Sequence, residues 1–255
     1  MRIIAAGLTD VGLQREHNED AFSILAEHGL FLVADGMGGH RSGEVASGMV
    51  AESMQEFFET TAKEDATWPF PIDPNLSLAE NRLAGAIKYA NKRIFDRSLT
   101  EAAVQGMGTT VVGILTSTEP ALAHVAHVGD SRVYRLREGK LLQLTRDHSL
   151  VNDYMMMVPD MPKEAMDILP KNVITRALGM QDSVVVDLTT ETLQVGDLFL
   201  LCTDGLSGQV TDETIQEILA SDGSLDERAK TLVQLSNDAG GEDNVTVVLV
   251  AAEPD

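Results

Sequence analysis

LFLVADGMGGH, residues 30–40, runs from consecutive apolar residues straight into a carboxylate, Asp35, and then into a cluster of glycines. The apolar run predicts a strand that is buried on both faces. The pattern returns at 198–205, LFLLCTDG, and at 124–130, HVAHVGD, where it ends in Asp130. A further acid, Asp243, stands immediately before the strand-like run NVTVVLV. Four acids from separate parts of the chain are therefore expected at the ends of strands.

One Asp-Gly pair is ordinary turn chemistry, but the repetition favours a site. If the strand ends converge, the carboxylates lie within a few ångströms of one another. Two unit charges about 4 Å apart repel by roughly 4 kcal/mol at an effective dielectric constant near 20. Several such acids cannot all stay ionised without cations, and hard divalent ions such as Mg²⁺ or Mn²⁺ prefer oxygen ligands. Gly36 has no side chain, so its carbonyl can approach an ion closely.

Composition narrows the class of protein. The 255 residues are 44% apolar, which suits one α/β domain with a sizeable core. Asp and Glu outnumber Lys and Arg by 40 to 19, and the resulting charge of −21 argues against nucleic-acid binding. No run of eighteen apolar residues indicates a membrane span, and the N-terminal apolar stretch is too short for a secretory signal. The single cysteine, Cys202, makes a cytoplasmic, reducing setting the default expectation.

The order of expected elements favours an antiparallel α+β layered fold. Apolar residues at three- and four-residue steps predict a helix over about 43–62, and Ser77 with Glu80 has capping-box spacing for a second one. Two further helices are expected at 212–220, with Thr211 as N-cap, and at 225–237. The expected strands are 2–8, 20–25, 30–34, 109–116, 121–128, 132–137, 140–144, 184–190, 197–202 and 245–251.

Residues 147–175 lack a clean period and contain three prolines, so we expect a long irregular insert there, which is usually functional. Five methionines fall between 155 and 166, and methionine suits adaptable contact surfaces. The alternative is a small local core beneath the insert. No break in the chain suggests a second domain, so residues 1–255 are expected to form one domain.

Other chemistries fit poorly. The glycines after Asp35 lack the last glycine of G-x-G-x-x-G, since position 41 is Arg, and no P-loop occurs. GLSG at 205–208 is not a nucleophile elbow, and Cys202 sits inside an apolar run. Without C-x-x-C or H-E-x-x-H, a zinc site is not expected. His17, His124 and His127 are interpreted as structural or as residues that support the site from behind the ligands.

The chain resembles the metal-dependent protein phosphatases of type 2C, the PPM family, in their bacterial single-domain form. The matching segments follow the family's order and span nearly the whole chain. They are TDVGLQREHNEDA (9–21), VADGMGGHRSGEVAS (33–47), GMGTTVV (106–112), HVGDSRVYRL (127–136), TRDHSL (145–150), ITRALG (174–179), LLCTDGLSG (200–208) and GGEDNVTVVLV (240–250).

This resemblance implies a four-layer α/β/β/α sandwich of two antiparallel sheets flanked by helices. It also implies two Mg²⁺ or Mn²⁺ ions in a cleft at one edge, and a flap made by the 147–175 insert. Asp35 would bridge the ions, Gly36 would ligate one of them through its carbonyl, and Asp204 and Asp243 would ligate the other. Asp130, sharing Asp204, would help to bind a third, weaker ion.

The remaining implied roles surround these ligands. Glu19 and Asp20 would hold waters of the ions, and Asn244 would support Asp243. Arg15 would bind the substrate phosphate, for which its planar fork of donors is suited. His40 would be the general acid for the leaving alkoxide, since its unperturbed pKa is near 6.5.

The function that we expect is hydrolysis of phosphoserine and phosphothreonine in proteins by water, in opposition to a protein kinase and as a monomer. Two metals suit this reaction because they acidify a water and offset the charge of the phosphoryl oxygens. Two alternatives stay open: a non-catalytic member of the same fold that binds a signalling partner, and an acidic ion-binding protein.

Overall fold

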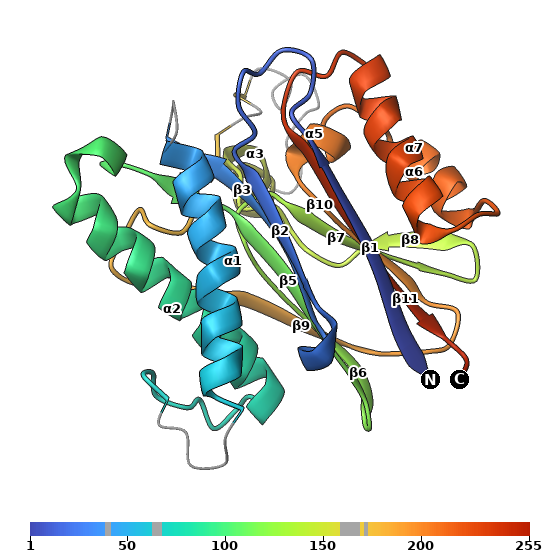
Figure 1. Cartoon of the computed structure of the whole chain (residues 1–255), viewed down its shortest axis with the longest axis horizontal. Coiled ribbons are helices and arrows are strands. Elements are labelled where there is room, and N and C mark those ends of the chain that lie inside the picture. Colours follow the sequence, from blue (N-terminus) through green and yellow to red (C-terminus); the bar gives the residue numbers. More distant parts are fainter. Residues whose placement is uncertain (39–41, 63–67, 159–168, 171–172) are drawn as a thin grey trace.

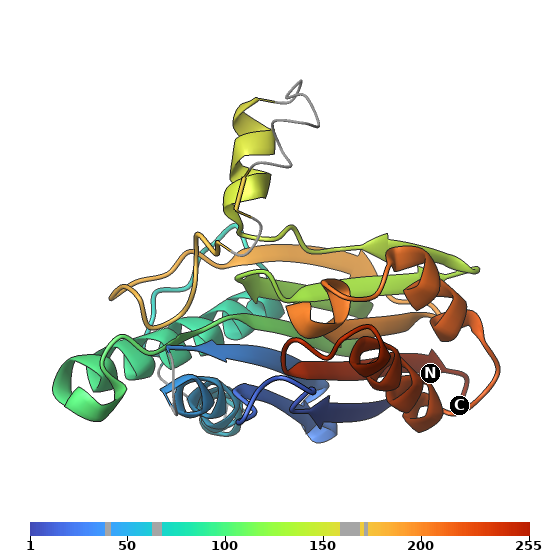
Figure 2. The ribbon, with the colours of Figure 1, turned by 90° about the horizontal axis from the view of Figure 1, so that it is seen from above.

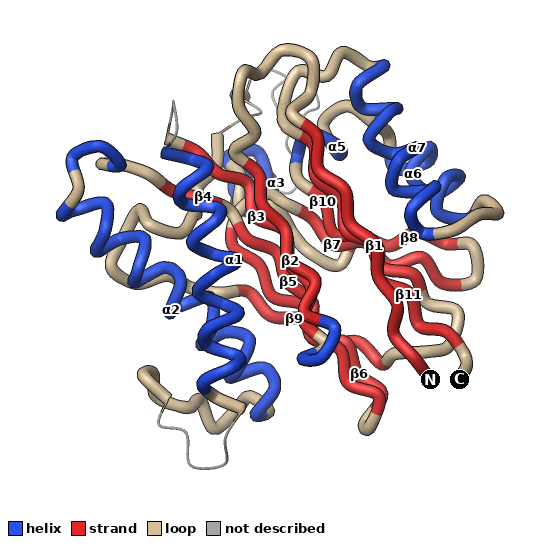
Figure 3. Tube along the Cα trace, in the orientation of Figure 1, coloured by secondary structure: helices blue, strands red, loops and turns tan. Residues whose placement is uncertain are grey.

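The computed structural model describes residues 1–38, 42–62, 68–158, 169–170 and 173–255. Its strands form two antiparallel sheets (Figures 1 and 3). The first sheet has the order β1 (Arg2–Asp10), β11 (Val245–Glu253), β10 (Leu198–Cys202), β7 (Arg132–Arg137) and β8 (Lys140–Gln143). The second has the order β2 (Asp20–Leu25), β3 (Leu30–Met37), β5 (Val111–Thr118), β6 (Ala121–Val128) and β9 (Asp187–Thr192), and β4 (Gly108–Thr109) pairs with β3.

Helices cover the outer face of each sheet (Figure 1). The second sheet is covered by α1 (Ser42–Thr60) and α2 (Leu78–Thr100), and the first by α6 (Asp212–Ala220) and α7 (Leu225–Asp238). Short helices η1 (Ala26–His28), η2 (Ala102–Val104) and α5 (Asp204–Ser207) complete the body, whereas α3 (Leu150–Met157) stands away from it (Figure 2). Among the described helices, none combines the length and apolar character needed to cross a bilayer. The predicted four-layer sandwich is confirmed.

Three separate apolar cores hold these layers together, because the central strands bury side chains on both faces. In β3, Leu30, Leu32 and Ala34 pack under α1 and α2, while Phe31 and Val33 point to the other sheet. The same alternation divides β10: Leu198, Leu200 and Cys202 face α6 and α7, and Phe199 and Leu201 face the second sheet. Burial on both sides explains why these strands read as unbroken apolar runs.

This alternation also sets the direction of the Asp35 side chain. Asp35 lies two residues after Val33 in the same strand, so its side chain points to the inter-sheet side. The antiparallel pairing brings together the end of β3, the start of β2, the end of β10 and the start of β11 at one edge of the sandwich. Acids that are far apart in the sequence therefore meet at this edge.

Several local predictions are confirmed. Ser77 and Glu80 form the capping box of α2, and the Thr211 side chain caps α6 by accepting from the Thr214 amide. Glu138 and Gly139 join β7 to β8 with positive φ values of 51° and 73°, as a two-residue hairpin turn requires.

The 147–175 insert is not wholly irregular, because it contains α3. Ser149 caps this helix by accepting from the Asn152 amide, yet α3 buries none of its own residues. A helix without a buried face shows no apolar period, so the sequence pattern missed it. The strand expected at 184–190 lies at Asp187–Thr192, and the short helix α5 was not expected.

The core between the sheets should dominate stability. Phe199 is completely buried there. Phe199→Ala is expected to lower the free energy of unfolding by about 3–5 kcal/mol, because a large cavity opens between the sheets. Leu142→Ala, at a side chain that is 49% exposed, should cost less than about 1 kcal/mol. Urea unfolding followed by circular dichroism measures both, and equal costs would contradict the expectation.

Candidate active site

The predicted acids converge at the edge where the two sheets meet. Asp20 and Asp35 are direct Cα partners on β2 and β3, so their side chains share one face of the second sheet. Burial, followed by repulsion from Asp20, Asp204, Asp130 and Asp243, raises the pKa of Asp35 well above its usual value. The Asp35 carboxyl is therefore repelled by acids from both sheets.

Four other carboxyls at this edge also have raised pKa values. Burial raises the pKa of Asp20 to about 7, and burial with repulsion from Asp204 raises the pKa of Asp130 to about 7. Burial and repulsion from Asp243 raise the pKa of Asp204, and burial raises that of Glu19. Within the described part of the chain, four of their oxygens are buried without a hydrogen-bond partner: Glu19 Oε1, Asp20 Oδ1, Asp130 Oδ1 and Asp204 Oδ1.

This donor set fits hard divalent cations. Carboxylate oxygens are the ligands that Mg²⁺ and Mn²⁺ prefer, and buried oxygens without protein donors need a cation, a water or a proton. Asp35, Asp204, Asp243 and Asp130 would hold such ions, with Glu19 and Asp20 next to them.

Gly36 is required by packing as well as by any metal contact. A Cβ atom at this position would lie 2.1 Å from the Gly43 carbonyl oxygen and 2.5 Å from that of Glu19. The Gly36 amide donates to the Glu19 carbonyl at 3.0 Å, and a Cβ atom at Gly43 would lie 2.7 Å from Glu19 Cδ. The end of β3, the first turn of α1 and Glu19 are thus locked together.

Asn244 ties three segments of the site together. Its Nδ2 donates to the carbonyl oxygens of Val11 and His17, both at 2.9 Å, and its Oδ1 accepts from the Glu19 amide at 2.7 Å. Asp243 Oδ1 accepts from the Asn244 amide at 2.8 Å. The predicted supporting role of Asn244 therefore extends to the loop that carries Glu19.

Two threonines that the sequence analysis missed hold Asp20. Its Oδ2 accepts from Thr246 Oγ1 at 2.7 Å and from Thr203 Oγ1 at 3.0 Å. Both residues are completely buried, and each lies within three residues of a predicted ligand. A hydroxyl beside a functional acid in an otherwise apolar strand was the signal that could have identified them.

A second set of polar residues, also missed, fixes the segment around Asp130. Thr110 Oγ1 lies 2.7 Å from Ser131 Oγ and accepts from the Asp35 amide at 3.1 Å. Arg132 makes a bidentate pair with Asp147, with Nε and Nη2 contacts of 3.0 and 2.7 Å. These contacts link the Asp130 segment to β3 and to the base of the flap.

Arg15 lies at the mouth of the site with its side chain 49% exposed. Its Nη2 donates to Asp243 Oδ2 at 2.6 Å, and its Nε donates to the Glu242 carbonyl at 3.4 Å. The guanidinium therefore faces the acids, and it currently neutralises one of the predicted ligands. His40, the predicted general acid, lies outside the described residues.

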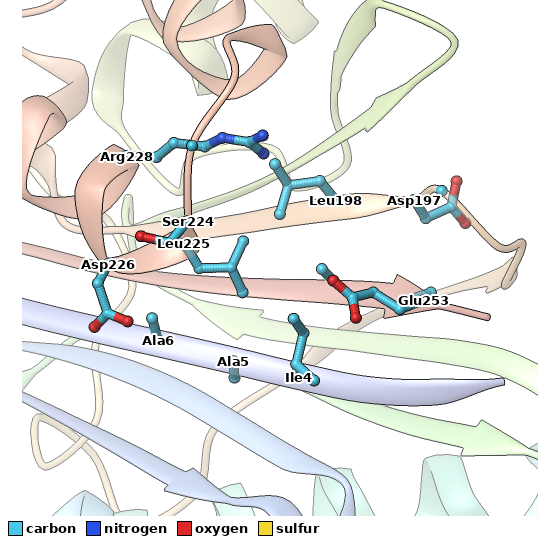
Figure 4. Close-up of a pocket in the computed structure, with 14 residues that line it drawn as sticks. Ile4, Ala5, Ala6, Asp197, Leu198, Ser224, Leu225, Asp226, Arg228 and Glu253 are labelled. Carbon is cyan, nitrogen blue, oxygen red and sulfur yellow. The ribbon is translucent and has the colours of Figure 1, made fainter. Parts of the chain in front are cut away.

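A separate cavity of about 460 Å³ lies between β1, β11 and the start of α7 (Figure 4). Its walls include Ala5, Leu198, Leu225 and Arg228, and none of the predicted site residues lines it. It is therefore distinct from the acidic edge.

Comparison with known proteins shows the family of the chain. The family model described as "Protein phosphatase 2C" matches residues 14–246. Serine/threonine phosphatase stp of Listeria monocytogenes is 38% identical over 250 residues, which cover 95% of this chain and 93% of that protein.

Solved structures give the same result. The Mycobacterium tuberculosis serine/threonine phosphatase PstP/Ppp has a TM-score of 0.85 at 34% identity, with full coverage of both chains. The catalytic domain of PstP in complex with two manganese ions has a TM-score of 0.82 at 35% identity, with 99% of each chain covered. The fold is that of a PPM-type phosphatase. The chain belongs to the protein phosphatase 2C family, and the resemblance found in its sequence is confirmed.

The raised pKa values predict how the metal-free protein responds to pH. Asp20 and Asp130 have pKa values of about 7 in the folded chain and near 3.9 when unfolded. Their protons stabilise the fold at low pH, and this stabilisation is lost as the pH rises through about 7. In EDTA, the free energy of unfolding, and with it the thermal midpoint, should therefore fall between about pH 5 and pH 7, by up to about 1.4 kcal/mol per pH unit for each of the two groups, and should level off above about pH 8.

Scanning fluorimetry at several pH values measures this fall in the thermal midpoint. In EDTA, the midpoint of Asp204→Asn should depend less on pH, because one source of repulsion is gone. In the unaltered protein, Mn²⁺ should abolish the pH dependence of the midpoint. A midpoint that stays constant or rises over this pH range in EDTA would show that the acids are not mutually strained.

Proposed function

We propose that the protein is a metal-dependent phosphatase that hydrolyses phosphoserine and phosphothreonine in proteins. The observation that carries this proposal is the meeting of acids from both sheets, where four buried carboxylate oxygens have no hydrogen-bond partner among the residues that the structure describes. Relatives of similar length that are named serine/threonine phosphatases support the substrate class.

The site would hold two Mg²⁺ or Mn²⁺ ions, with Asp35 between them, the Gly36 carbonyl on one, and Asp204 and Asp243 on the other. Asp130, near Asp204, would contribute to a third, weaker site. When bound, such ions acidify a water for attack at neutral pH and offset the charge of the phosphoryl oxygens. The relative solved with two manganese ions supports this assignment.

The chain's own residues orient the substrate. Arg15 is half exposed at the mouth, so its guanidinium can exchange the Asp243 contact for two oxygens of an incoming phosphate. His40 would donate a proton to the leaving serine or threonine oxygen. Thr203, Thr246 and Asn244 keep Asp20 and Asp243 in place through the hydrogen bonds described above.

We propose further that residues 1–255 form one catalytic domain and act as a monomer in the bacterial cytoplasm, against a serine/threonine kinase, without binding membranes or nucleic acid. Cys202 supports a reducing compartment, since it is completely buried and burial raises the pKa of its thiol to about 12. The negative charge supports the absence of nucleic acid.

Turnover of p-nitrophenyl phosphate and of a phosphothreonine peptide tests this function. With Mn²⁺ present, Asp204→Asn should lower kcat/KM by at least about 100-fold, because a carboxylate proposed to hold the metal ions loses its charge. EDTA should abolish turnover by the unaltered protein.

Asp222→Asn, the same change at an exposed acid beyond α6, is the matched control and should retain full activity. Mn²⁺ binding without turnover in the unaltered protein would favour the non-catalytic signalling alternative. Turnover that persists in EDTA would contradict a metal-dependent enzyme.

We propose that the flap selects phosphopeptides. Met155, Met156 and Met157 on α3 are 44%, 62% and 78% exposed, which does not support a local core at these positions. A hollow of about 550 Å³ also borders the flap base; it begins at Met37, next to Gly36, and is lined by residues 174–177, Met180 and 183–185. A hollow lined by both apolar and polar side chains therefore extends from the edge of the site along the flap base.

Replacing Met155, Met156 and Met157 together with Gln should change the kcat/KM ratio between two phosphopeptides by about threefold or more. Gln keeps the helix propensity of Met, so the change removes apolar contact alone. Turnover of p-nitrophenyl phosphate, which has no peptide, should stay constant. Leu99→Gln, at a side chain that is 69% exposed on α2, is the control. Unchanged peptide preference would refute the role.

A further inference from the structure

Two buried histidines and an acid form a cluster behind the Asp130 segment. His127 belongs to β6, His148 lies just before α3, and Asp187 begins β9 as the Cα partner of His127. The two imidazoles stack with centroids 4.6 Å apart and an angle of 9° between their planes. His148 is 1% exposed, and its Nε2 faces Asp187 Oδ2 at 3.3 Å.

The three residues offer ligand atoms within 4.8 Å of one another, but the geometry does not suit a metal ion. A metal bound to imidazole lies in the plane of the ring, and two stacked, nearly parallel rings have no such point in common. The donor atoms are also engaged elsewhere. His127 Nε2 donates to the Arg146 carbonyl at 2.8 Å, and Asp187 Oδ1 accepts from Arg176 Nη1 at 2.6 Å.

The hydrogen bonds define the tautomer of His148. The Gly129 amide donates to His148 Nδ1 at 3.0 Å, so this nitrogen carries a lone pair. Burial lowers the pKa of His148, and the neutral ring then has its hydrogen on Nε2, toward Asp187. His148 Nε2 has no hydrogen-bond partner among the described residues, so its contact with Asp187, which pairs with Arg176, is electrostatic, and the hydrogen bond to the ring comes from the Gly129 amide.

His148 holds both polar groups of the Gly129 backbone. Besides accepting from the Gly129 amide through its ring, it donates its own amide to the Gly129 carbonyl at 2.9 Å. Its carbonyl accepts from the Thr175 amide at 2.9 Å, on the far side of the flap. One residue thus bridges the Asp130 segment and both ends of the flap base.

Gly129 directly precedes Asp130, and its backbone has little freedom to move. It has a φ of +111°, and a Cβ atom there would lie 2.6 Å from Thr110 Cβ. Asp130 Oδ1 is buried without a hydrogen-bond partner among the described residues. The direction of the Asp130 carboxylate therefore depends on how the Gly129 backbone is held.

We propose that His148, oriented by Asp187, is a positioning residue that fixes Asp130 for cation binding and connects it to the base of the flap. This inference rests on the proposed function, in which Asp130 binds a divalent cation. His148 touches neither substrate nor cation and acts through the Gly129–Asp130 backbone.

Two substitutions at position 148 separate positioning from simple packing. In His148→Asn, Oδ1 can take the place of Nδ1 and accept from the Gly129 amide. In His148→Gln, the amide group reaches the position of Nε2 instead, and the Gly129 amide loses its acceptor. Free Mn²⁺, followed by electron paramagnetic resonance during a titration, should show about tenfold weaker binding at the weakest site for His148→Gln. His148→Asn should stay within about twofold of the unaltered protein.

The controls use the same assay. Asp130→Asn should remove the weakest site, and adding His148→Gln to it should have no further effect. His124→Gln is the matched control, because His124 lies in the same strand as His127, is 3% exposed and hydrogen-bonds Thr190 through Nδ1. Its Mn²⁺ binding should be unchanged.

The outcomes distinguish the two proposals. If Asp130→Asn leaves Mn²⁺ binding intact, the metal role of Asp130 in the proposed function is wrong. The positioning role is overturned if Asp130→Asn weakens Mn²⁺ binding but His148→Gln does not. It is also overturned if His148→Asn binds Mn²⁺ as weakly as His148→Gln does. If His148→Gln does not fold, Asp187→Asn provides the test, because it keeps both imidazoles. A several-fold loss of Mn²⁺ affinity in Asp187→Asn would support the inference, and an unchanged affinity would refute it.

Discussion

The negative charge gathered where the two sheets meet is the constraint on which the rest of the structure depends. Asp35 lies near four other acids, and their repulsion adds to the free energy that is needed to ionise its carboxyl. Burial makes this repulsion stronger, because little water screens it. The charge must be balanced by protons or by cations, so protonation, stability and ion binding are linked at one place in the molecule.

A site under such repulsion needs a framework that does not depend on the charges themselves. Hydroxyl and amide groups supply it: Thr203 and Thr246 hold Asp20, and Asn244 joins the chain at Val11, His17 and Glu19. Close backbone approaches add to it. A Cβ atom at Gly205 would lie 1.9 Å from the Asn244 carbonyl oxygen, so α5 and the start of β11 cannot separate without breaking the packing.

Many of the helices, strands and acid positions could be predicted from the sequence, because burial in this fold produces periodic patterns of apolar residues. The apolar runs before Asp35 and Asp204 placed the acids at strand ends, and capping residues placed α2 and α6. The pairing of distant strands is not visible in local periodicity, so convergence of the acids was an expectation until the sheet order was known.

Other features left weaker traces in the sequence. Thr203, Thr246 and Thr110 look like ordinary β-branched strand residues, and only their neighbours in space give them a role. His127 was expected to be structural or to lie next to the site, and its stacking on His148 could not be read from the sequence because it joins two segments of the chain. Helix α3 was not predicted, because apolar periodicity indicates only helices with a buried face, and α3 has no buried face.

That property of α3 bears on how relatives of this chain can diverge. Core positions such as Phe199 tolerate few replacements, since each change there alters packing on several sides. A projecting helix with no interior contacts of its own is free of that limit (Figure 2). Evolution can therefore replace the outer residues of α3 with little effect on folding, so this part of the surface can change between relatives while the layers beneath the helix stay the same.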